Sequence, residues 1–464
     1  MKKSKFINII QTCVWINLRY SLLFIISLPI QAGEISLDTA IEQAQRNDPW
    51  LVENQFVQDA LESKSVAAGT LPDPTVSLGL LNLDTDSFDF NQDPMTQLKI
   101  GISQSFPRGD TLRLRTQKLL LLSGQNPHLR SNRKAQLSVM VTGLWLDVFN
   151  AEESIRLIEK DRELFEQLVD ISEASYSSAY GNTQQQDVIR AQLELTRLDD
   201  RLAKLRQQQE VAQKQLIQWI SGQFMEHYAN DNITSITSIT NSNGRQLPQQ
   251  VLLQPELMHI EDATLPDILT SYFIQHPSIA ALESRIKASD TEIELTRQKY
   301  KSQWGVNAGY GYRGDNQLGD NRADLLSVGV NFDLPLFTEN RQDKQMQAAV
   351  SEAEAVKTQK WLLLRKMISA FEAAKVQLQR LDQRHQLYQQ QLLPQIHEQA
   401  EAALTAYTND EGDFSEVVRA RIDVLDAEID KLGIEVEQQK TISQLNYYLV
   451  STADNNIDST EGGK

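Results

Sequence analysis

The longest regular pattern in the chain is a coiled-coil seam, in which apolar residues recur at alternating spacings of four and three. It covers residues 137–169 and, after a break at "AYGNTQQQ", residues 188–205. The same pattern covers residues 367–381 and, after a break at "YTNDEGDF", residues 418–432. A continuous helix over residues 111–179 would be roughly 100 Å long, at about 1.5 Å per residue. We therefore expect long paired helices that cannot fold back into a small globule.

A second pattern, the alternation of apolar with small or polar residues, predicts β-strands. It is clearest in "WGVNAGYGYRGDN", where Trp304, Tyr310 and Tyr312 fall on the apolar face. This stretch also has the glycine spacing of a dinucleotide-binding loop, but such a loop requires a helix that begins at the third glycine. A polar turn follows instead. We therefore interpret the stretch as a strand.

Strands of this kind are predicted at about residues 74–83, 95–106, 303–313 and 323–335. Their lengths are roughly the 9 to 11 residues that a tilted crossing of a lipid bilayer requires. A soluble sandwich with one buried face is the alternative. Four strands are too few for the two sheets of a sandwich, and they lie beside very long helices, so we favour the membrane interpretation.

The chain contains an internal duplication, visible as one constant offset between matching landmarks. Three pairs of landmarks share this offset: Pro49 and Pro277, Val76 and Trp304, and Pro107 and Pro335. We predict two structural repeats, at residues 33–222 and 262–450. A polar low-complexity linker at 223–261 separates them, and a polar tail follows at 451–464.

Each repeat is predicted to contain two strands followed by two long helices. The helices are expected at about residues 110–179 and 184–222 in the first repeat, and at about 338–406 and 414–450 in the second. The strands cannot leave their edges open in hydrocarbon, because each unsatisfied amide there costs several kcal/mol.

Four strands cannot close on themselves, so the closed structure must be shared between chains. Two copies would supply eight strands, and the interior of such a barrel fills with side chains, whereas three copies would supply twelve strands and a lumen. The predicted fold class is therefore a mixed α+β membrane protein. A long α-helical coiled-coil barrel would be continuous with a transmembrane β-barrel, with four strands per chain, closed as a trimer.

The N-terminal residues have the pattern of a secretory signal peptide. Basic residues precede an apolar run at 21–30, and we expect cleavage after it, near Ala32. A membrane-spanning anchor is the alternative, but it requires about 20 apolar residues, more than this run contains. The only cysteine, Cys13, would be removed with residues 1–32. Disulfides are therefore not expected to contribute to stability.

Charge and composition exclude several classes of function. The full chain has a formal net charge of -17, and removal of residues 1–32, which contain four basic and no acidic residues, leaves -21. This balance argues against nucleic acid as a partner. The six histidines have no metal-ligand spacing, and no catalytic constellation is present. We therefore expect no enzyme activity, no metal site and no cofactor.

Several stretches, in their order along the chain, carry a resemblance to a known family. They are "SLDTAIEQAQRNDP", the strand ending "FDLPLF", and "ARIDVLDAEID" after the second helical break. With the duplicated helix–strand–strand–helix–helix order, they resemble the TolC-type outer membrane efflux protein family over nearly the whole chain after residue 32.

The resemblance implies a homotrimer in the outer membrane of a Gram-negative bacterium, with a β-barrel in the lipid and an α-barrel in the periplasm. Such a trimer docks through a periplasmic adaptor, or membrane fusion protein, onto an inner membrane pump that is proton-driven. It serves as a passive exit duct. Relatives of heavy-metal pumps are similar around "DFSEVVRARIDVLDAE", but no residue selects a metal ion over a drug or a secreted polypeptide.

Two alternatives remain open at this point. The exit duct of a type I protein secretion system has the same architecture and would work with an ATP-driven exporter. A periplasmic structural coiled-coil protein belongs to another class, and it predicts that the strands do not enter a membrane.

In such a trimer the two breaks in the helical seams would form the periplasmic tips, where any gate must lie. The candidate gate residues are Asp187, Tyr407, Asp410, Glu411, Asp413 and Glu416. Three-fold copies of these carboxylates would form an acidic ring that favours cations, although charges beside a turn are equally consistent with solvation alone. The resemblance also implies a hydrogen-bonded latch between Tyr407 and Asp187. The residues expected at the helix turns and at the adaptor contact are Gly181, Asn182 and Gly412.

The strands supply two further sets of candidates. Lys99, Asn331 and Asp333 are expected to face the lumen. Trp304, Tyr310 and Tyr312 are candidates for an aromatic girdle, although an alternating aromatic face could equally be the core of a soluble sheet.

The chain departs from the family pattern in three places. "FTEN" replaces a glycine pair after Pro335, where Asn340 could adopt left-handed geometry. Pro127 falls within the first long helix and predicts a kink near Gln125 or Asn126. Gly412 stands two positions later than the family's usual tip glycine.

Overall fold

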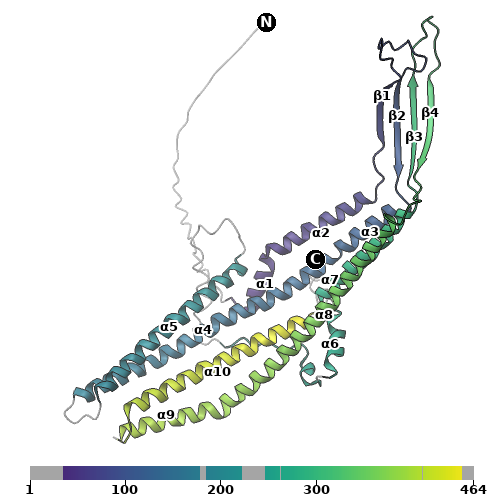
Figure 1. Ribbon diagram of the computed structural model, residues 1–464. Helices are drawn as coiled ribbons and strands as arrows, with labels where there is room; N and C mark the ends of the chain where they lie inside the picture. Colours follow the sequence, from purple (N-terminus) through teal and green to yellow (C-terminus); the bar gives the residue numbers. More distant parts are fainter. Residues whose placement is uncertain (1–34, 178–183, 222–245, 262, 410, 452–464) are drawn as a thin grey trace, which may run out of the picture.

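The computed structural model describes residues 35–177, 184–221, 246–261, 263–409 and 411–451. This part of the molecule is elongated, with a four-stranded antiparallel sheet at one end (Figure 1). The long helices extend away from the sheet, and the pairs α4–α5 and α9–α10 approach their turns at the opposite end. The strands and the helical tips are therefore separated by the full length of the protein.

The two halves of the chain contain the same series of elements. The first half contains α1 (Leu37–Asn47), α2 (Pro49–Ala68), β1 (Thr75–Leu81), β2 (Gln97–Phe106), α3 (Thr111–Ser123), α4 (Gln125–Ser177) and α5 (Gln185–Ile220). The second half contains η3 (Pro255–His259), α6 (Leu265–Phe273), α7 (Pro277–Arg297), η4 (Gln298–Tyr300), β3 (Trp304–Tyr312), β4 (Leu325–Phe332), α8 (Gln342–Leu387), η5 (Tyr388–Leu392), α9 (Leu393–Thr408) and α10 (Phe414–Leu449). The starting residues of α1 and α6, of α2 and α7, and of β2 and β4 differ by the same offset as the landmarks in the sequence.

The sheet joins the two halves at its centre. Its strand order is β1-β2-β3-β4, and all three pairs of neighbours are antiparallel. The central pair consists of β2 from the first half and β3 from the second, in a register that places Gly101 opposite Gly309. Each strand lies within the range predicted from alternation. The outer positions are occupied by β1 and β4.

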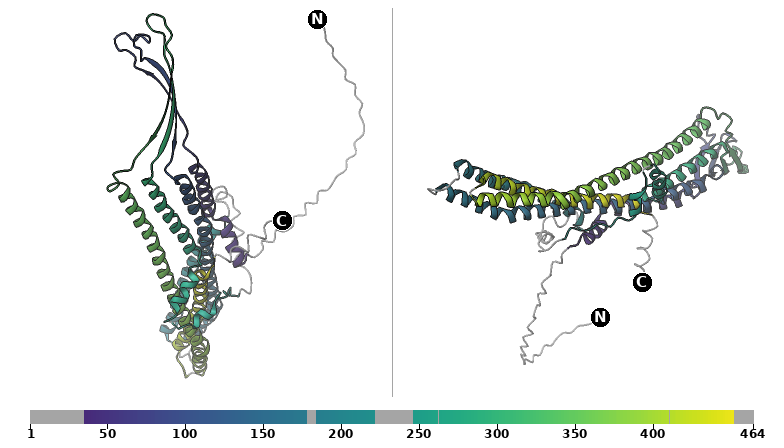
Figure 2. Two further views of the ribbon diagram at one scale, coloured as in Figure 1. Left: turned by 90° about the vertical axis from the view of Figure 1, so that its right-hand side faces the viewer. Right: turned by 90° about the horizontal axis from the view of Figure 1, so that it is seen from below.

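The helices lie side by side in one curved layer (Figure 2). Next to the sheet the order of neighbours is α2, α3, α7 and α8, and farther from it the order is α5, α4, α10 and α9. The short helix α1 packs on α4 and α5, and α6 packs on α8. Because the wall is one helix thick over most of its length, its lateral edges remain open in a single chain.

The heptad positions form the contacts within this layer. Near the tips, Ile158 and Phe165 of α4 pack with Leu198 and Leu202 of α5 and with Leu425 of α10, and all five are buried. These positions were predicted from the alternating spacing of four and three. Burial of each such side chain contributes about 1.5–3 kcal/mol, so this seam is a main source of stability in the helical part.

The first long helix is interrupted at Gly124, beside the position predicted from Pro127. Proline has no N–H, so it cannot donate to the carbonyl of Ser123. The side chain of Asn126 donates to that carbonyl instead, with an Nδ2–O distance of 3.1 Å. Asn126 is 1% exposed, and its Oδ1 accepts from Asn54 of α2 at 2.9 Å. The interruption is therefore a hydrogen-bonded junction between α2 and α4.

A second interruption was not expected. The helix predicted over 338–406 begins at Gln342 and contains a π-helical turn, η5, before Pro394. A proline inside a helix clashes with the carbonyl four residues earlier, and one wide turn removes that clash. The left-handed geometry considered for Asn340 is also absent, since within the described residues only Asn82 and Phe88 have positive φ outside glycine.

Helix α7 begins at a buried histidine. His276 is 0% exposed, and its Nδ1 accepts from the backbone N–H of Ser278 at 3.2 Å. Its Nε2 lies 3.0 Å from the carbonyl of Tyr447 and must therefore donate, which fixes the neutral tautomer. Burial lowers the pKa of His276 to about 4, although the Tyr447 carbonyl opposes this shift.

We predict that His276 makes the fold sensitive to acid. Since its folded pKa lies below its unfolded value, the unfolded state binds the proton first, and stability falls as the pH drops from about 6.5 to about 4. The full effect is about 3 kcal/mol. His276→Asn retains a side-chain acceptor at the start of α7 and should show a shallower decline in unfolding temperature over this range.

The matched control is His259→Asn at an exposed position, which should follow the wild-type curve. Thermal unfolding of the purified protein in detergent at several pH values measures the difference. Equal slopes for His276→Asn and the wild type would show that the buried imidazole does not control the acid response.

Candidate functional site

The sheet presents one continuous apolar face. Its register aligns Leu78, Ile100, Tyr310 and Leu326 in one row across the four strands, and parallel rows above and below contain further valine, isoleucine and aromatic residues. These side chains are exposed, with Leu78 at 74% and Leu326 at 77%. Exposed apolar area costs about 25 cal/mol per Å² in water. An apolar patch that spans all four strands therefore marks an interaction surface.

The opposite face of the sheet is small and polar. One row contains Ser77, Gly101, Gly309 and Ser327. Long polar side chains lie across the glycines: a Cβ on Gly309 would be 2.7 Å from Cε of Lys99, and one on Gly305 would be 2.5 Å from Oδ1 of Asn331. The glycines of "WGVNAGYGY" thus leave room for the long side chains of the neighbouring strands. This face carries Lys99 and Asn331, two of the predicted lumen residues.

The third predicted lumen residue, Asp333, lies just beyond β4 at the base of the sheet. It forms an ion pair with Arg108 and accepts from the backbone N–H of Gln303 at 2.7 Å. The Gln303 N–H, together with the nearby Arg108 guanidinium, lowers the pKa of the Asp333 carboxyl. Asp333 therefore links the ends of β2, β3 and β4 where the sheet meets the helices.

The predicted aromatic residues occupy the two ends of the apolar face. Trp304 contacts Phe332 at the end nearest the helices, with 4.9 Å between ring centroids. Tyr310 and Tyr312 lie at the far end of β3, where Tyr312 stacks on Phe90 at 6.2 Å. Eight residue steps at about 3.3 Å each separate Trp304 from Tyr312 by roughly 26 Å.

Both lateral edges of the chain are open. Neither β1 nor β4 has an outer strand partner within the described ranges. The helices below the two edges also expose large apolar side chains: Phe56 of α2 is 68% exposed and Trp361 of α8 is 64% exposed. Each edge therefore combines unpaired backbone groups with apolar side chains.

The helical tips have tight local structure. At the first tip, Asp187 of α5 accepts from the backbone N–H of Gln184 at 2.9 Å in a capping box. At the second, Asp413 precedes α10 and accepts from the backbone N–H of Ser415 at 3.0 Å, while Glu416 lies in the first turn. These carboxylates stabilise helix N-termini. Gly181, Asn182 and Asp410 lie outside the described residues.

Tyr407 and Asp187 are not joined by a hydrogen bond in the part of the protomer that the structure describes. Tyr407 instead packs against Phe414 across the second tip, with 5.5 Å between ring centroids. Between them, Gly412 approaches the end of α9 so closely that a Cβ would lie 2.8 Å from the backbone nitrogen of Tyr407. Glu411 donates its N–H to the Ala406 carbonyl at 2.9 Å. This turn therefore depends on the absence of a side chain at position 412.

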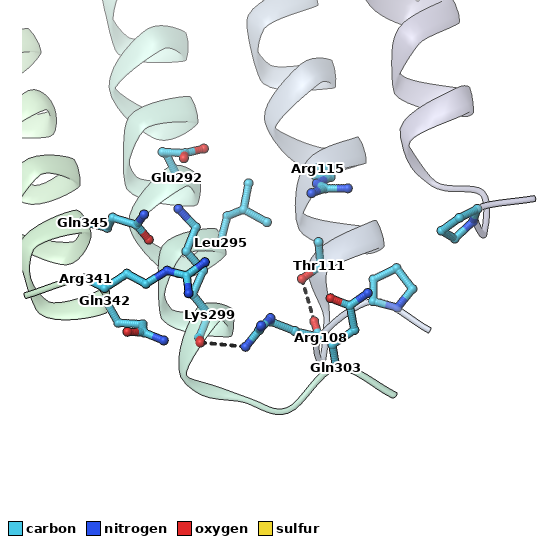
Figure 3. Close-up of a pocket in the computed structure, with 12 residues that line it drawn as sticks. Arg108, Thr111, Arg115, Glu292, Leu295, Lys299, Gln303, Arg341, Gln342 and Gln345 are labelled. Atoms are coloured by element: carbon cyan, nitrogen blue, oxygen red, sulfur yellow. Dashed lines mark hydrogen bonds between the residues drawn. The ribbon is translucent and has the colours of Figure 1, made fainter. Parts of the chain in front are cut away.

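A polar cleft of about 510 Å³ lies where the sheet meets the helices (Figure 3). It opens between α3, α7 and the start of α8, and Arg115, Lys299 and Arg341 are among its lining residues. These cations were not singled out from the sequence, because they are distant along the chain and belong to no motif.

The described ranges contain neither a candidate metal site nor a candidate membrane-spanning helix. They contain no group of three or more histidine, cysteine, aspartate or glutamate side chains that could hold a metal ion. No helix in them combines the length and the apolar character needed to cross a membrane.

Comparison with known proteins gives a match in fold but none in sequence. No protein-family model and no curated protein sequence matches the chain. The outer membrane protein VceC from the bacterial pathogen Vibrio cholerae is 14% identical, with a TM-score of 0.69 over 89% of this chain and 94% of VceC. The Campylobacter jejuni CmeC outer membrane channel is 12% identical, with a TM-score of 0.70 over 92% of this chain and 89% of CmeC.

A third solved structure, CusC, is described as forming a transmembrane channel. It is 14% identical, with a TM-score of 0.68 over 89% of this chain and 92% of CusC. The chain therefore has the fold of these channels, which confirms the resemblance predicted from its sequence.

We predict that Gly412→Ala loosens the second tip. The new Cβ would clash with backbone atoms of Ala406 and Tyr407, which cannot move without breaking the turn. The Glu411 N–H should then exchange with solvent about tenfold faster or more, which corresponds to about 1.4 kcal/mol. Hydrogen exchange measured by mass spectrometry on peptides that span the tip reports this change.

Gly433→Ala is the matched control. Position 433 lies within α10, and a Cβ there meets nothing within 4 Å. Alanine favours a helix over glycine by about 1 kcal/mol, so exchange in α10 should become slower or stay unchanged. Wild-type exchange at the tip in Gly412→Ala would contradict the packing argument.

Proposed function

We propose that this protein is the outer membrane channel of a tripartite efflux system in a Gram-negative bacterium. Three copies close into one conduit that acts as a passive exit duct, and an inner membrane pump supplies the energy. The observation that carries the proposal is the sheet, whose one face is apolar and exposed and whose two edges are unpaired.

Closure by three copies satisfies both requirements of the sheet. Hydrocarbon can cover the apolar face, but it cannot satisfy the backbone groups of β1 and β4, so these edges must pair with sister chains. Twelve strands leave a lumen, which the polar face with Lys99 and Asn331 would line. Phe56 on α2 and Trp361 on α8 are exposed on the helices below these two edges, and contacts with sister chains would cover them.

The apolar band fits the thickness of an outer membrane. The apolar bands of outer membrane barrels are about 25 Å tall, and aromatic girdles flank them on both sides. Trp304 at one end of β3 and Tyr312 at the other are roughly 26 Å apart along a strand of 9 residues, the length that a tilted crossing requires. We assign these residues to the two girdles. The helices then extend into the periplasm, with their tips farthest from the membrane.

The tips are the proposed docking end for a periplasmic adaptor and the place of the gate. Helices related by a three-fold axis can converge there, so the exposed carboxylates of Glu411, Asp413 and Glu416 would form an acidic ring, whereas Asp187 is buried and caps α5. Such a ring selects cations at the entrance. A heavy-metal ion or a cationic drug is the substrate class that this charge favours.

The strand faces can be distinguished by one pair of substitutions. Val328 and Ser327 are neighbours at the centre of β4 and lie on the apolar and polar faces respectively. Arginine on the lipid face costs about 2–4 kcal/mol at the membrane midplane, so Val328→Arg should reduce heat-modifiable trimers in outer membrane fractions about tenfold or more. Ser327→Arg, which faces the lumen, should assemble normally.

Equal assembly of the two variants would contradict the assignment of the faces. The wild-type protein provides a test of the whole proposal. A monomer that stays soluble without detergent and gives no conductance in planar bilayers would be incompatible with a channel formed by three chains.

The acidic ring can be tested without disturbing the helix caps. Asparagine caps helices as well as aspartate does, so Asp413→Asn with Glu416→Gln removes charge while keeping the start of α10. We expect the cation-over-anion permeability ratio in planar bilayers to fall by about twofold or more. Asp267→Asn with Glu256→Gln, far from the tips, removes the same charge and should leave the ratio unchanged. An unaltered ratio in the tip variant would exclude the ring.

A further inference from the structure

The cleft at the junction of sheet and helices collects positive charge in a strongly acidic protein. Four cations and one carboxylate, Glu292, line it, whereas the chain as a whole has a net charge of -17. Glu292 is already paired with Lys118, with an Nζ–Oε2 distance of 2.8 Å. The local excess of cations is therefore opposite in sign to the rest of the molecule.

Three of these cations have no counter-ion among the described residues. Arg108 is committed to Asp333 and to the carbonyls of Lys299 and Lys301. The guanidinium groups of Arg115 and Arg341, and the ammonium of Lys299, form no ion pair or hydrogen bond with any residue that the structure describes. Figure 3 shows Arg341, just before α8, and Lys299, in η4, pointing into the cleft. Like charges in one cleft repel each other unless an anion lies between them.

The side-chain oxygen of a buried amide in the same cleft also lacks a hydrogen-bond partner among the described residues. Gln342 follows Arg341 at the start of α8 and is 8% exposed. Its Oε1 is buried without a hydrogen bond. Buried polar atoms without partners are rare and costly. Because the two ends of an amide can exchange, Gln342 can present either a donor or an acceptor to a bound group.

The register of the strands fixes the side on which the cleft opens. Gln303 lines it and is bonded to Asp333 in both directions: its N–H donates to the carboxylate at 2.7 Å, and its carbonyl accepts from the backbone N–H at 3.3 Å. This pairing continues the β3–β4 ladder beyond Trp304 and Phe332. Since side chains alternate along a strand, Gln303 lies on the polar face, opposite Trp304.

We propose that this cleft is a binding site for the phosphate group of a soluble anion. The guanidinium groups of Arg115 and Arg341 and the ammonium of Lys299 would hold its oxygens, and Gln342 would complete the set. The inference rests on the proposed function in one respect, namely that the polar face lines the conduit. Three copies would then form a ring of cations where the sheets join the helices, at the end of the helices opposite the acidic tips.

The test uses the full mature protein in a non-ionic detergent, with inorganic phosphate as the probe. Broadening of the phosphorus resonance during a titration gives the dissociation constant. Arg115→Gln with Arg341→Gln should weaken binding at least about tenfold, the loss expected when a charge-assisted contact worth about 1.5 kcal/mol is removed. The corresponding lysine variants, which keep the charge, should retain measurable binding.

Arg46→Gln with Arg156→Gln is the matched control, since both arginines are exposed and the same charge is removed. It should bind phosphate as the wild type does. Wild-type protein that shows no saturable binding, or a control that loses as much as the cleft variant, would overturn the proposal. Heat-modifiable trimers in all variants verify that they fold.

A lipid headgroup carries the same chemistry, and a second titration distinguishes it. Phosphatidylglycerol in nanodiscs should leave phosphate binding intact if the occupant is a soluble anion, and displacement by this lipid would overturn that assignment. The phosphate site and the proposed channel function can be disproved independently. Phosphate binding is measured without any conductance, so binding by a protein that forms no channel would retain the site and reject the function.

Discussion

The structure depends on the need to pair the backbone groups along the two outer strands. A sheet of four strands has two free edges, and each unpaired amide costs several kcal/mol once water is removed. The exposed row of Leu78, Ile100, Tyr310 and Leu326 is apolar, and the membrane location proposed for it would remove that water. A single chain cannot pair its outer strands in such a surrounding, whereas a closed ring of chains can. The single curved layer of helices has the same property, because it too has two open sides.

Local patterns predicted the elements well because their causes are local. Alternation located the strands, and heptad spacing located Ile158, Leu198 and Leu425 in the seam. The interruption beside Pro127 was predicted for the same reason, although the role of Asn126 as a replacement donor was not. The π-helical turn before Pro394 was missed, since the long regular run around it favoured one unbroken helix. The roles expected for the tip carboxylates remain predictions, and their capping bonds were not anticipated.

The cleft could not be predicted, because its residues meet only after folding. Arg115 lies on α3, Lys299 in η4 and Arg341 before α8, so no window of sequence contains them together. Composition even argued against such a site, since the net charge is strongly negative. The role of His276 was equally hidden, because its burial depends on its contact with Tyr447 of α10, far away in the sequence.

The constant offset between α1 and α6, α2 and α7, and β2 and β4 has a consequence for ancestry. Inside the chain, β2 of one half pairs with β3 of the other. In a closed trimer, β4 must pair with β1 of the next chain, which repeats the same kind of strand pairing. Six half-length chains could therefore have built an ancestral ring in which one strand pairing occurs six times. Fusion of two such halves would have allowed alternate pairings to diverge, so that opposite sides of one gate could acquire different residues.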